Sequence, residues 1–307
     1  MKTQYVNYEK PLVSIVMATY NGERYLKEQL DSILNQSVQN FELIICDDCS
    51  TDRTLDILNE YSERDKRISI FPNNINIGVK RNFERGISLS NCDLIAFSDQ
   101  DDIWRHDHIE LLMNTIGDKM MACGNSDMIY EDGTPMGMTL SYQDAFDYIP
   151  KNDLYKAMTI ILFRNPFQGA SMMIRKELFI QAGPVPENVG FHDEWLAAYA
   201  SFYGGINYIK DSLLKYRRLS SSVTGIKNKR RNKILAWRNH HFYEDRIYII
   251  NAILERNKKL SQEQIQYLCL WKKMYWRNNK VKGKILNALY KIKYYKYIYS
   301  CDFTHWI

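Results

Sequence analysis

Short apolar runs alternate with expected helices through the first third of the chain. The runs are residues 12–18, 41–46, 68–71 and 94–97. They are short and nearly continuous, which is typical of strands that are buried on both faces of a sheet. Helices are expected between them, at residues 25–34, 53–64 and 79–89. This alternation predicts a doubly wound α/β fold with a mainly parallel sheet flanked by helices.

The middle of the chain is less regular. We expect a strand at residues 120–123, a further segment at 168–175 and a helix after the sequence His192-Asp193-Glu194. Turn residues such as Glu131-Asp132-Gly133 interrupt any longer periodicity. The order of elements in this part of the chain therefore stays open.

Helix breakers separate the body of the chain from its tail. All seven prolines lie at or before Pro186, and Gly283 is the one glycine after Gly225. A segment without helix breakers favours helices. We therefore expect a ligand-binding domain over residues 1–226 and a helical C-terminal region over residues 227–307.

Polar residues gather where three of the expected strands end. These ends carry Tyr20-Asn21, Asp47-Asp48 and the residues Asp99 to Asp102. The carboxyl ends of parallel strands meet at one edge of a sheet, and open α/β sheets bind their ligands in the crevice there. Three polar strand ends that converge on one crevice predict a ligand site better than any one of them alone.

The turn Asp99-Gln100-Asp101-Asp102 suits a divalent metal ion. Carboxylates in one turn repel one another unless a cation neutralises them, and hard oxygen ligands suit Mg2+ or Mn2+. One alternative is an acidic turn that caps a helix after Trp104. Another is a phosphatase in which Asp99, after an apolar strand, is the nucleophile and Asp101 the acid.

A second carboxylate suits a nucleotide base. Asp48 follows the second strand, and a carboxylate there can accept a hydrogen bond from the imide N–H of uracil or thymine. Tyr20, at the neighbouring strand end, can stack on the same base. The alternative is a capped turn before the helix expected to begin at Arg53.

Three motifs in order connect these residues to a known family. The sequences are MATYNGERYLKEQLDSILNQS, DDCSTDRT and SDQDDIW. Together they resemble the family 2 glycosyltransferases, over about the first 110 residues and more weakly to near Gly225. The resemblance implies the GT-A fold, a nucleotide-sugar donor and inversion at the anomeric carbon. The variant SDQDDIW is similar to that of bacterial rhamnosyltransferases and related surface-polysaccharide enzymes.

The resemblance implies roles for individual residues. Tyr20 and Asp48 match positions that hold the base, Asp99 matches the first carboxylate of the DxD motif, and Asp101 matches the direct metal ligand. Lys80 or Arg81 would reach the base or the phosphates. The donor site implied in this way consists of Thr19, Tyr20, Asn21, Asp48, Arg81, Asp99 and Gln100, with Lys80 as a further candidate.

The sequence His192-Asp193-Glu194-Trp195 resembles the base motif of the family. Asp193 matches the catalytic base, His192 replaces a preceding acid, and Glu194 is a second candidate. Inverting transfer needs such a base to take the proton of the acceptor hydroxyl. The alternative is that Asp193 caps the helix that follows.

Residues 216–225 resemble a loop that covers the donor. Relatives often carry a histidine near Leu219 and an asparagine near Ser222, and both are missing here. If the histidine holds metal or phosphate in relatives, Arg217 or Arg218 would take its place.

Composition indicates a globular, reduced protein. Hydrophobic residues make up 45% and charged residues 25%, which excludes a disordered chain. No run approaches the roughly 18 apolar residues that span a bilayer, and the first residues lack the apolar core of a secretory signal. Six cysteines are too sparse for a disulfide scaffold. We therefore expect a cytoplasmic protein.

The charge is divided between an acidic body and a basic tail. The net charge is +5, but the residues from Lys227 onward carry +14 and the remainder carries −9. Cations beside tyrosines, as in residues 280–296, suit an anionic membrane surface at the inner face of the plasma membrane. Alternatives are a solvated helical bundle or an interface, including that of a homo-oligomer. No nucleic-acid motif is recognised, and the acidic body argues against a nucleic-acid partner.

Together these features predict a metal-dependent inverting glycosyltransferase. It would move a sugar from a UDP- or dTDP-linked donor, with dTDP-rhamnose as one candidate, to a growing lipid-linked polysaccharide such as a capsule or O-antigen. The alternative is a non-catalytic nucleotide-sugar-binding or scaffolding subunit of a glycan-assembly complex. The departures from the family pattern at His192, Leu219 and Ser222 keep that alternative open.

Overall fold

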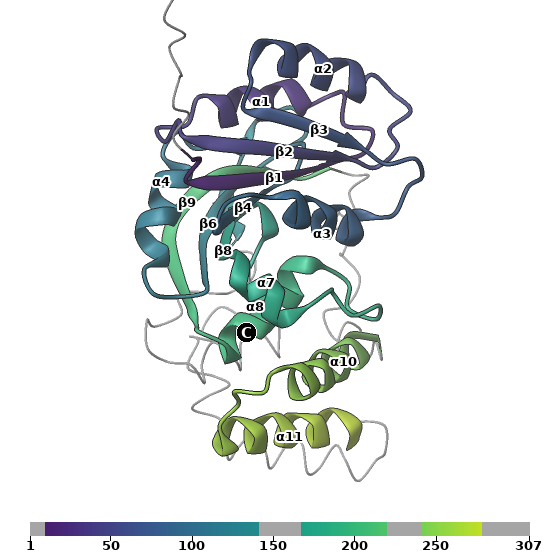
Figure 1. Cartoon of the computed structure of the whole chain (residues 1–307), viewed down its shortest axis with the longest axis vertical. Helices are drawn as coiled ribbons and strands as arrows, with labels where there is room; N and C mark the ends of the chain where they lie inside the picture. Colours follow the sequence, from purple (N-terminus) through teal and green to yellow (C-terminus); the bar gives the residue numbers. More distant parts are fainter. Residues whose placement is uncertain (1–9, 141–166, 220–240, 278–307) are drawn as a thin grey trace, which may run out of the picture.

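The computed structural model describes residues 10–140, 167–219 and 241–277 of the 307-residue chain (Figure 1). Within these residues a nine-stranded sheet has the order β3-β2-β1-β4-β8-β6-β9-β5, and β7 pairs with β6. The strands are β1 (Val13–Thr19), β2 (Phe41–Asp47), β3 (Ile68–Pro72), β4 (Leu94–Ser98), β5 (Ile103–Trp104), β6 (Met121–Ile129), β7 (Pro135–Thr139), β8 (Met172–Arg175) and β9 (Ile206–Arg217). The helices are α1 (Leu26–Leu34), α2 (Thr54–Arg64), α3 (Val79–Leu89), α4 (His108–Ile116), the 3-10 helix η1 (Gly169–Ser171), α7 (Lys176–Ala182), α8 (His192–Phe202), α10 (His241–Arg256) and α11 (Gln262–Arg277).

The two halves of the sheet differ in strand direction. β3, β2, β1 and β4 are parallel neighbours, whereas β8 is antiparallel to both β4 and β6. β9 is parallel to β6 and antiparallel to β5. The parallel half has the strand–helix alternation predicted from the sequence, and the predicted α/β class is confirmed. Because β8 is reversed, its beginning lies at the same edge of the sheet as the ends of β1, β2 and β4.

Two hydrophobic cores cover the two faces of the sheet. One core joins Ile15 of β1 to Leu30 of α1. The other joins Val16 of the same strand to Phe83 of α3 and Trp195 of α8. Figure 1 shows α1 and α2 on one side of the sheet and α3 on the other. β1 is thus covered on both faces, as its continuous apolar run predicts.

The region after the acidic turn differs from the prediction. The helix expected after Trp104 is present as α4, but Ile103–Trp104 forms β5, a strand that the sequence does not predict and that pairs with β9. Helix α4 begins at His108, so the carboxylates of residues 99–102 do not cap it. β6 is also longer than the strand predicted at residues 120–123, because its second half pairs with β9. Both differences depend on pairing with a strand about 90 to 110 residues further along the chain, which local sequence does not reveal.

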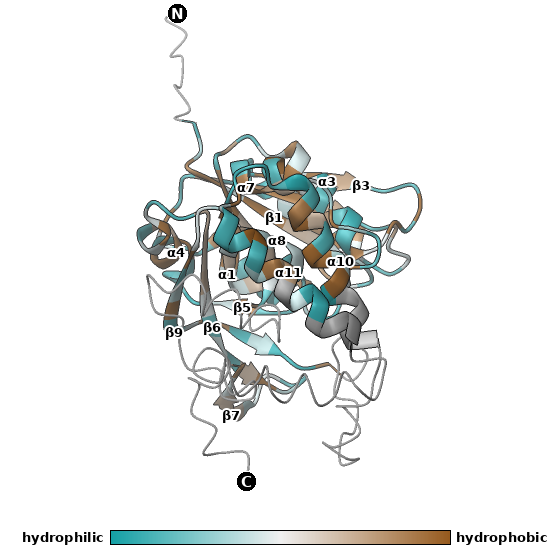
Figure 2. Ribbon diagram, turned by 90° about the horizontal axis from the view of Figure 1, so that it is seen from below, coloured by the Kyte–Doolittle hydropathy of each residue, from teal (hydrophilic) through white to brown (hydrophobic). Residues whose placement is uncertain are grey.

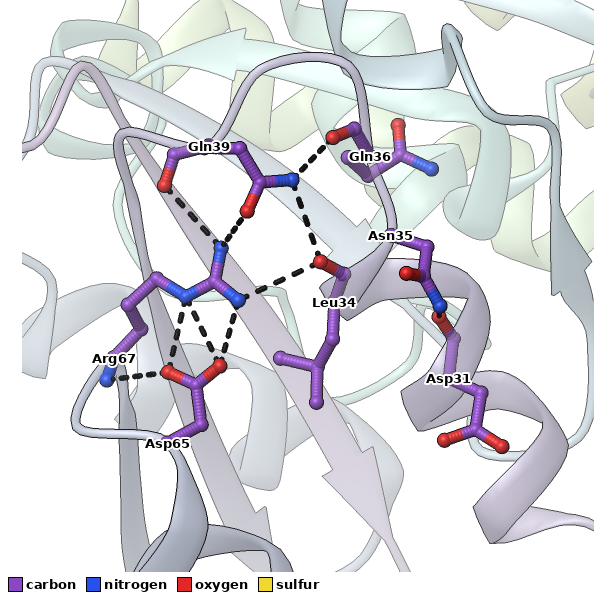
Figure 3. Close-up of polar contacts among 7 residues, drawn as sticks. All are labelled: Asp31, Leu34, Asn35, Gln36, Gln39, Asp65 and Arg67. Atoms are coloured by element: carbon purple, nitrogen blue, oxygen red, sulfur yellow. Dashed lines mark hydrogen bonds and ion pairs between the residues drawn. The ribbon is translucent and has the colours of Figure 1, made fainter.

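A hydrogen-bond network, here named the Arg67 network, fixes the amino-terminal edge of the parallel half (Figure 3). The Arg67 guanidinium, just before β3, donates to both carboxylate oxygens of Asp65, at 2.6 to 3.2 Å. It also donates to the side-chain oxygen of Gln39 at 2.8 Å and to the carbonyl oxygen of Leu34 at 3.5 Å. Bidentate, charge-assisted bonds are among the strongest in proteins. The network therefore links the end of α1 and the segment after it, through Leu34 and Gln39, to Arg67 at the start of β3.

Helices α10 and α11 lie on the α8 side of the molecule (Figure 1). Ile249, Ile250 and Ile253 of α10 are fully buried in the core that includes α8. Seen from below, α10 shows both hydrophobic and hydrophilic residues (Figure 2). In the part of the chain described, no helix is both long and apolar enough to cross a membrane. The predicted boundary between residues 226 and 227 and the basic segment 280–296 lie outside the described residues.

Candidate active site

The ends of β1, β2 and β4 meet at one edge of the sheet, here named the carboxyl edge. β1 and β2 end in register, with Thr19 opposite Asp47, and the Thr19 hydroxyl donates to Asp47 Oδ1 at 2.8 Å. Gln168 and Gly169 precede the reversed strand β8 and so lie at this edge as well. The three polar strand ends predicted from the sequence are thus brought together, and a fourth segment joins them.

Tyr20 and Gln100, both predicted to bind the donor, are bonded to each other. Gln100 Oε1 accepts the Tyr20 N–H at 2.8 Å, and Gln100 Nε2 donates to the Tyr20 carbonyl at 3.0 Å. A Cβ atom at Gly22 would lie 2.2 Å from Gln100 Oε1, so this pairing requires glycine at position 22. Asn21 has a φ of 49°, and its Oδ1 accepts the Thr51 N–H at 2.8 Å. These bonds fix the backbone and leave the Tyr20 side chain 48% exposed.

Asp48 shapes the neighbouring loop. Its carboxylate accepts hydrogen bonds from the Asn73 side-chain amide and from the N–H groups of Ile77 and Gly78, each at 2.8 Å. Gly78 has a φ of 83°, a conformation that favours glycine. A carboxylate has about four acceptor positions, so roughly one remains for a ligand. Asp48 is only 3% exposed.

Three aspartates gather directly after β4. Burial, together with the charges of Asp101 and Asp193, raises the pKa of Asp99 to about 7. Burial likewise raises the pKa of Asp101 to about 6, while the Arg217 guanidinium opposes the shift. Asp102 is fully buried, and burial together with the two neighbouring aspartates holds its pKa well above the ordinary value. Its Oδ1 accepts the Arg217 N–H at 3.0 Å, whereas its Oδ2 meets no hydrogen-bond donor within the described structure.

The chemistry of these oxygens fits a hard divalent cation. A cation at Asp99 and Asp101 would relieve the repulsion that raises the pKa of Asp99. In residues 10–140, 167–219 and 241–277, no three His, Cys, Asp or Glu side chains are grouped as a complete metal site. The two aspartates would therefore supply part of a coordination shell and leave positions for substrate phosphates.

Arg217 is buried and already bonded. Its side chain is 2% exposed and ion-paired with Glu28 of α1. Its Nε donates to the Asp101 carbonyl at 2.9 Å and its Nη1 to the Glu131 carbonyl at 3.0 Å. Arg217 therefore supplies positive charge beside the aspartates from a fixed position. The Arg218 N–H donates to the carbonyl of the last residue of β6 at 3.0 Å.

Asp193 is the one residue of α8 that is only partly buried; the other ten are buried. It lies at the carboxyl edge, because the N–H of Gly169, which precedes β8 at that edge, donates to its carboxylate. Its charge also contributes to the raised pKa of Asp99. Desolvation by its surroundings, together with the charge of Glu194, raises the pKa of Asp193 itself to about 7. The N–H groups of Gly169 and Glu194 donate to its carboxylate, the latter at 2.6 Å. A carboxylate with a pKa near neutrality is suited to general base catalysis.

His192 is a packed, neutral side chain. Its ring lies 4.0 Å from that of Phe83 and 5.1 Å from that of Phe97, centroid to centroid. Burial lowers the pKa of His192 to about 3, so the imidazole is uncharged at neutral pH. A Cβ atom at Gly169 would lie 2.9 Å from His192 Nε2. Glycine at position 169 thus leaves room for the imidazole while its N–H holds Asp193.

Lys80 and Arg81 are both engaged with the segment around Glu187. Lys80 Nζ donates to the carbonyls of Glu187 and Val189, at 3.0 and 2.8 Å. Arg81 is ion-paired with Glu84 and Glu187. In this arrangement neither cation points to the aspartates, and their predicted contact with the donor would require other side-chain positions.

Two residues beside Asp193 have no counterpart in the sequence prediction. Gly169 reaches the site only because β8 runs antiparallel to β4. Arg246 of α10 is ion-paired with Glu194, from 52 positions further along the chain. The segment 168–175 is apparent from the sequence, but strand direction and helix packing are tertiary properties that no local pattern encodes.

Solved structures share this arrangement of strands and helices. Staphylococcus aureus TarS in complex with UDP-GlcNAc matches 94% of this chain and 81% of its own, with a TM-score of 0.59 and 16% identity. The mannosyltransferase PcManGT from Pyrobaculum calidifontis, in complex with GDP-Man and Mn2+, matches 94% of this chain and 81% of its own, with a TM-score of 0.55 and 16% identity. The fold is therefore that of the GT-A glycosyltransferases, as predicted.

A sequence model described as glycosyl transferase family 2 matches residues 14–181, and the chain belongs to that family. An uncharacterized glycosyltransferase of Haemophilus influenzae is 30% identical over 235 residues, which is 73% of this chain and 70% of its own length. The dTDP-rhamnosyl transferase RfbG of Shigella flexneri is 30% identical over 231 residues, 68% of this chain and 73% of its own. Escherichia coli WfgD, a UDP-Glc:alpha-D-GlcNAc-diphosphoundecaprenol beta-1,3-glucosyltransferase, is 30% identical over 164 residues, 51% of this chain and 63% of its own.

Proposed function

We propose that this protein is a metal-dependent, inverting glycosyltransferase of bacterial surface-polysaccharide assembly. It moves a sugar from a UDP- or dTDP-linked donor to a lipid-linked glycan. One observation carries the proposal: Asp193, held by the N–H groups of Gly169 and Glu194, is the one α8 residue that is only partly buried, and it lies at the carboxyl edge, where its charge acts on Asp99.

Asp193 acts as the general base. It accepts the proton of the acceptor hydroxyl while that oxygen attacks the anomeric carbon from the side opposite the leaving diphosphate. Its pKa of about 7 leaves a substantial ionised fraction at neutral pH and makes the carboxylate basic enough for the task. Glu194, the second candidate, is ion-paired with Arg246 and so is less able to take the proton.

Tyr20 and Asp48 bind the nucleotide base. The exposed Tyr20 ring stacks on the base, and the remaining acceptor position of Asp48 receives its imide N–H. Thr19, Asn21 and Gln100 keep these two strand ends in position through the bonds described above.

Asp99 and Asp101 hold Mn2+ or Mg2+. The bound ion supplies positive charge to the diphosphate that departs. The hard oxygen chemistry of the two side chains and their raised pKa values support this role. The complex of PcManGT with Mn2+ supports use of a divalent metal ion within this fold.

The names of two relatives support the choice of substrates. RfbG is a dTDP-rhamnosyl transferase, and WfgD uses UDP-Glc with a diphosphoundecaprenol-linked acceptor. The SDQDDIW sequence makes dTDP-rhamnose the first donor to test. A lipid-linked acceptor would also give the basic tail a purpose at the inner face of the plasma membrane.

Calorimetric titration with UDP, dTDP, GDP and ADP, with and without Mn2+, tests the donor site. We expect metal-dependent binding of UDP or dTDP alone. Tyr20→Ala should weaken it roughly 10-fold or more, because stacking on a base contributes about 1–3 kcal/mol. Tyr248→Ala, at a tyrosine of α10 that is 42% exposed, is the matched control and should bind as the parent does. Absence of binding to all four nucleotides would contradict the proposal.

Release of nucleoside diphosphate from dTDP-rhamnose, UDP-glucose and UDP-GlcNAc, with a lipid-diphosphate glycan as acceptor, tests the reaction. Loss of release in Asp101→Ala and Asp193→Ala is the expected result, and retained release would contradict the assigned mechanism. Binding of a donor with neither transfer nor hydrolysis would instead support the alternative of a non-catalytic, nucleotide-sugar-binding subunit.

A further inference from the structure

Helix α10 reaches the first turn of α8 through one buried ion pair. Arg246 Nη1 donates to Glu194 Oε1, and the two side chains are 3% and 10% exposed. Ile249, Ile250 and Ile253 place Arg246 there, because they are buried in the core that α10 shares with α8. Removing one partner of a buried pair leaves an uncompensated charge, which is strongly unfavourable. The positive charge that compensates Glu194 therefore comes from α10.

Glu194 is the immediate neighbour of Asp193. Among the described residues, the other titratable groups near Asp193 are Asp99 at the end of β4, the neutral imidazole of His192 and the Cys123 thiol of β6. Burial and the charge of Asp193 both raise the pKa of Cys123. The remaining polar contacts are the N–H groups of Gly169 and Glu194. These groups are negative or neutral, so the positive charge that offsets Glu194 comes from Arg246.

We propose that Arg246 is a positioning residue for sugar transfer, which makes α10 a part of the catalytic unit. By neutralising Glu194, Arg246 leaves Asp193 as the negative charge that the first turn of α8 presents to the acceptor. The inference rests on the proposed role of Asp193 as the base. It gives the C-terminal region a function that is independent of any membrane contact.

The pH profile of nucleotide release from a donor sugar, measured on the full chain, tests this proposal. Arg246→Met leaves the Glu194 charge beside Asp193, so the acid limb of the profile should move to higher pH by about one unit. Glu194→Gln removes that charge and should move the limb to lower pH. Arg246→Lys keeps the cation and should keep the limb close to that of the parent. The double variant Glu194→Gln/Arg246→Met removes both charges, so the acid limb of its profile should return to the pH of the parent.

Arg256→Met is the matched control on the same helix. Arg256 donates to the carbonyls of Ala182 and Pro184, at 2.8 and 2.6 Å, and its guanidinium carbon lies 5.2 Å from the centroid of the Trp195 ring. These contacts of Arg256 stabilise the packing of α10, but within the described structure Arg256 has no bond to Glu194. Arg256→Met should therefore lower Tm and leave the acid limb of the pH profile unchanged.

The proposal would be overturned if the acid limb does not move in Arg246→Met, or if the double variant does not return the limb to the pH of the parent. If Arg246→Met fails to fold, the opposite shift in Glu194→Gln and its reversal in the double variant decide the question. Full turnover in Asp193→Asn would contradict the base role itself. An inactive Asp193→Asn with an unmoved limb in Arg246→Met would overturn only the role of Arg246.

Discussion

The two edges of the parallel half of the sheet hold carboxylates in opposite electrostatic states. At the amino-terminal edge, hydrogen bonds from Arg67 hold the pKa of Asp65 below its ordinary value (Figure 3). At the carboxyl edge, burial and neighbouring charges raise the pKa of Asp99, Asp101 and Asp193 to about 7, 6 and 7. At the amino-terminal edge, the Arg67 guanidinium is bonded to the carboxylate of Asp65. At the carboxyl edge, the negative charges of the grouped aspartates are not balanced by the cations beside them.

This difference separates residues that stabilise the fold from residues that are available for chemistry. The carboxylate of Asp65 is satisfied by Arg67 in the folded chain alone. Asp99 and Asp101 would become satisfied when a metal ion and a diphosphate bind. Strongly shifted pKa values of grouped acids are typical of functional sites, where stability is sacrificed for activity. The distinction between the two edges can be tested by making the same Asp→Asn substitution at each edge and comparing turnover and stability.

The largest expected effect comes from Asp193→Asn. We expect turnover to fall by about 10²- to 10⁴-fold, the usual contribution of a general base, with nucleotide affinity retained. Asp65→Asn, the same substitution at the amino-terminal edge, should lower Tm and leave turnover unchanged. Steady-state kinetics and thermal unfolding of both variants provide the measurement. Equal losses of turnover would remove the distinction between the edges.

A smaller loss of turnover is expected for Gly169→Ala. The new Cβ would lie 2.9 Å from His192 Nε2, so the segment must shift and its N–H must move relative to Asp193. A displacement of about 1 Å in a reacting group can cost about 100-fold in rate. His192→Ala in the same background opens space and should restore part of the activity. Unchanged kinetics in Gly169→Ala would show that this N–H does not orient the base.

Arg67→Met should act on stability alone. It removes the bonds to Asp65, Gln39 and Leu34, and bonds to charged groups contribute about 1.5–3 kcal/mol each at most. We expect the free energy of unfolding in urea to fall by about 1–3 kcal/mol while turnover of the folded fraction is retained. A loss of turnover without a loss of stability would contradict the assignment of this edge to the fold.

Asp99→Asn should change how stability depends on pH. The pKa of Asp99 is about 7 in the folded protein against 3.8 ordinarily, so the folded state binds a proton that the unfolded chain has already lost between these values. The free energy of unfolding therefore falls as pH rises from about 4 to 7. The variant should lack part of this decline and, without metal, be more stable than the parent at pH 7 by roughly 1 kcal/mol. Urea unfolding at several pH values measures it, and a parallel decline in both proteins would show that Asp99 does not cause the pH dependence.

The smallest effect is expected for Arg81→Met. Arg81 is ion-paired with Glu84 and the exposed Glu187, and such pairs contribute about 0–1 kcal/mol. Nucleotide affinity should stay the same as long as these pairs persist when the donor binds. A tenfold loss of affinity would show that Arg81 leaves them to reach the donor, the role that the family resemblance implies.

The sequence predicts those parts of the site that follow directly from an apolar run. Tyr20, Asp48 and Asp99 each come after such a run, so the parallel strand order alone brings them together. Gly169 and Arg246 follow from the direction of β8 and from the packing of α10. Both depend on contacts between distant segments. A single sequence therefore brings together the strand ends proposed to bind the nucleotide, but it does not reveal what surrounds Asp193, the proposed base.

The burial of α8 has a consequence for how this enzyme lineage can diversify. Ten of the eleven residues of the helix are buried, and Asp193 is the exception. A substitution along the helix body would disturb a packed interior, so α8 tolerates little variation. New sugars or acceptors can be accommodated where loops border the carboxyl edge, since such segments accept changes in length and sequence. Asp193, the proposed base, is therefore expected to stay in place among relatives, while substrate preference changes in the loops around it.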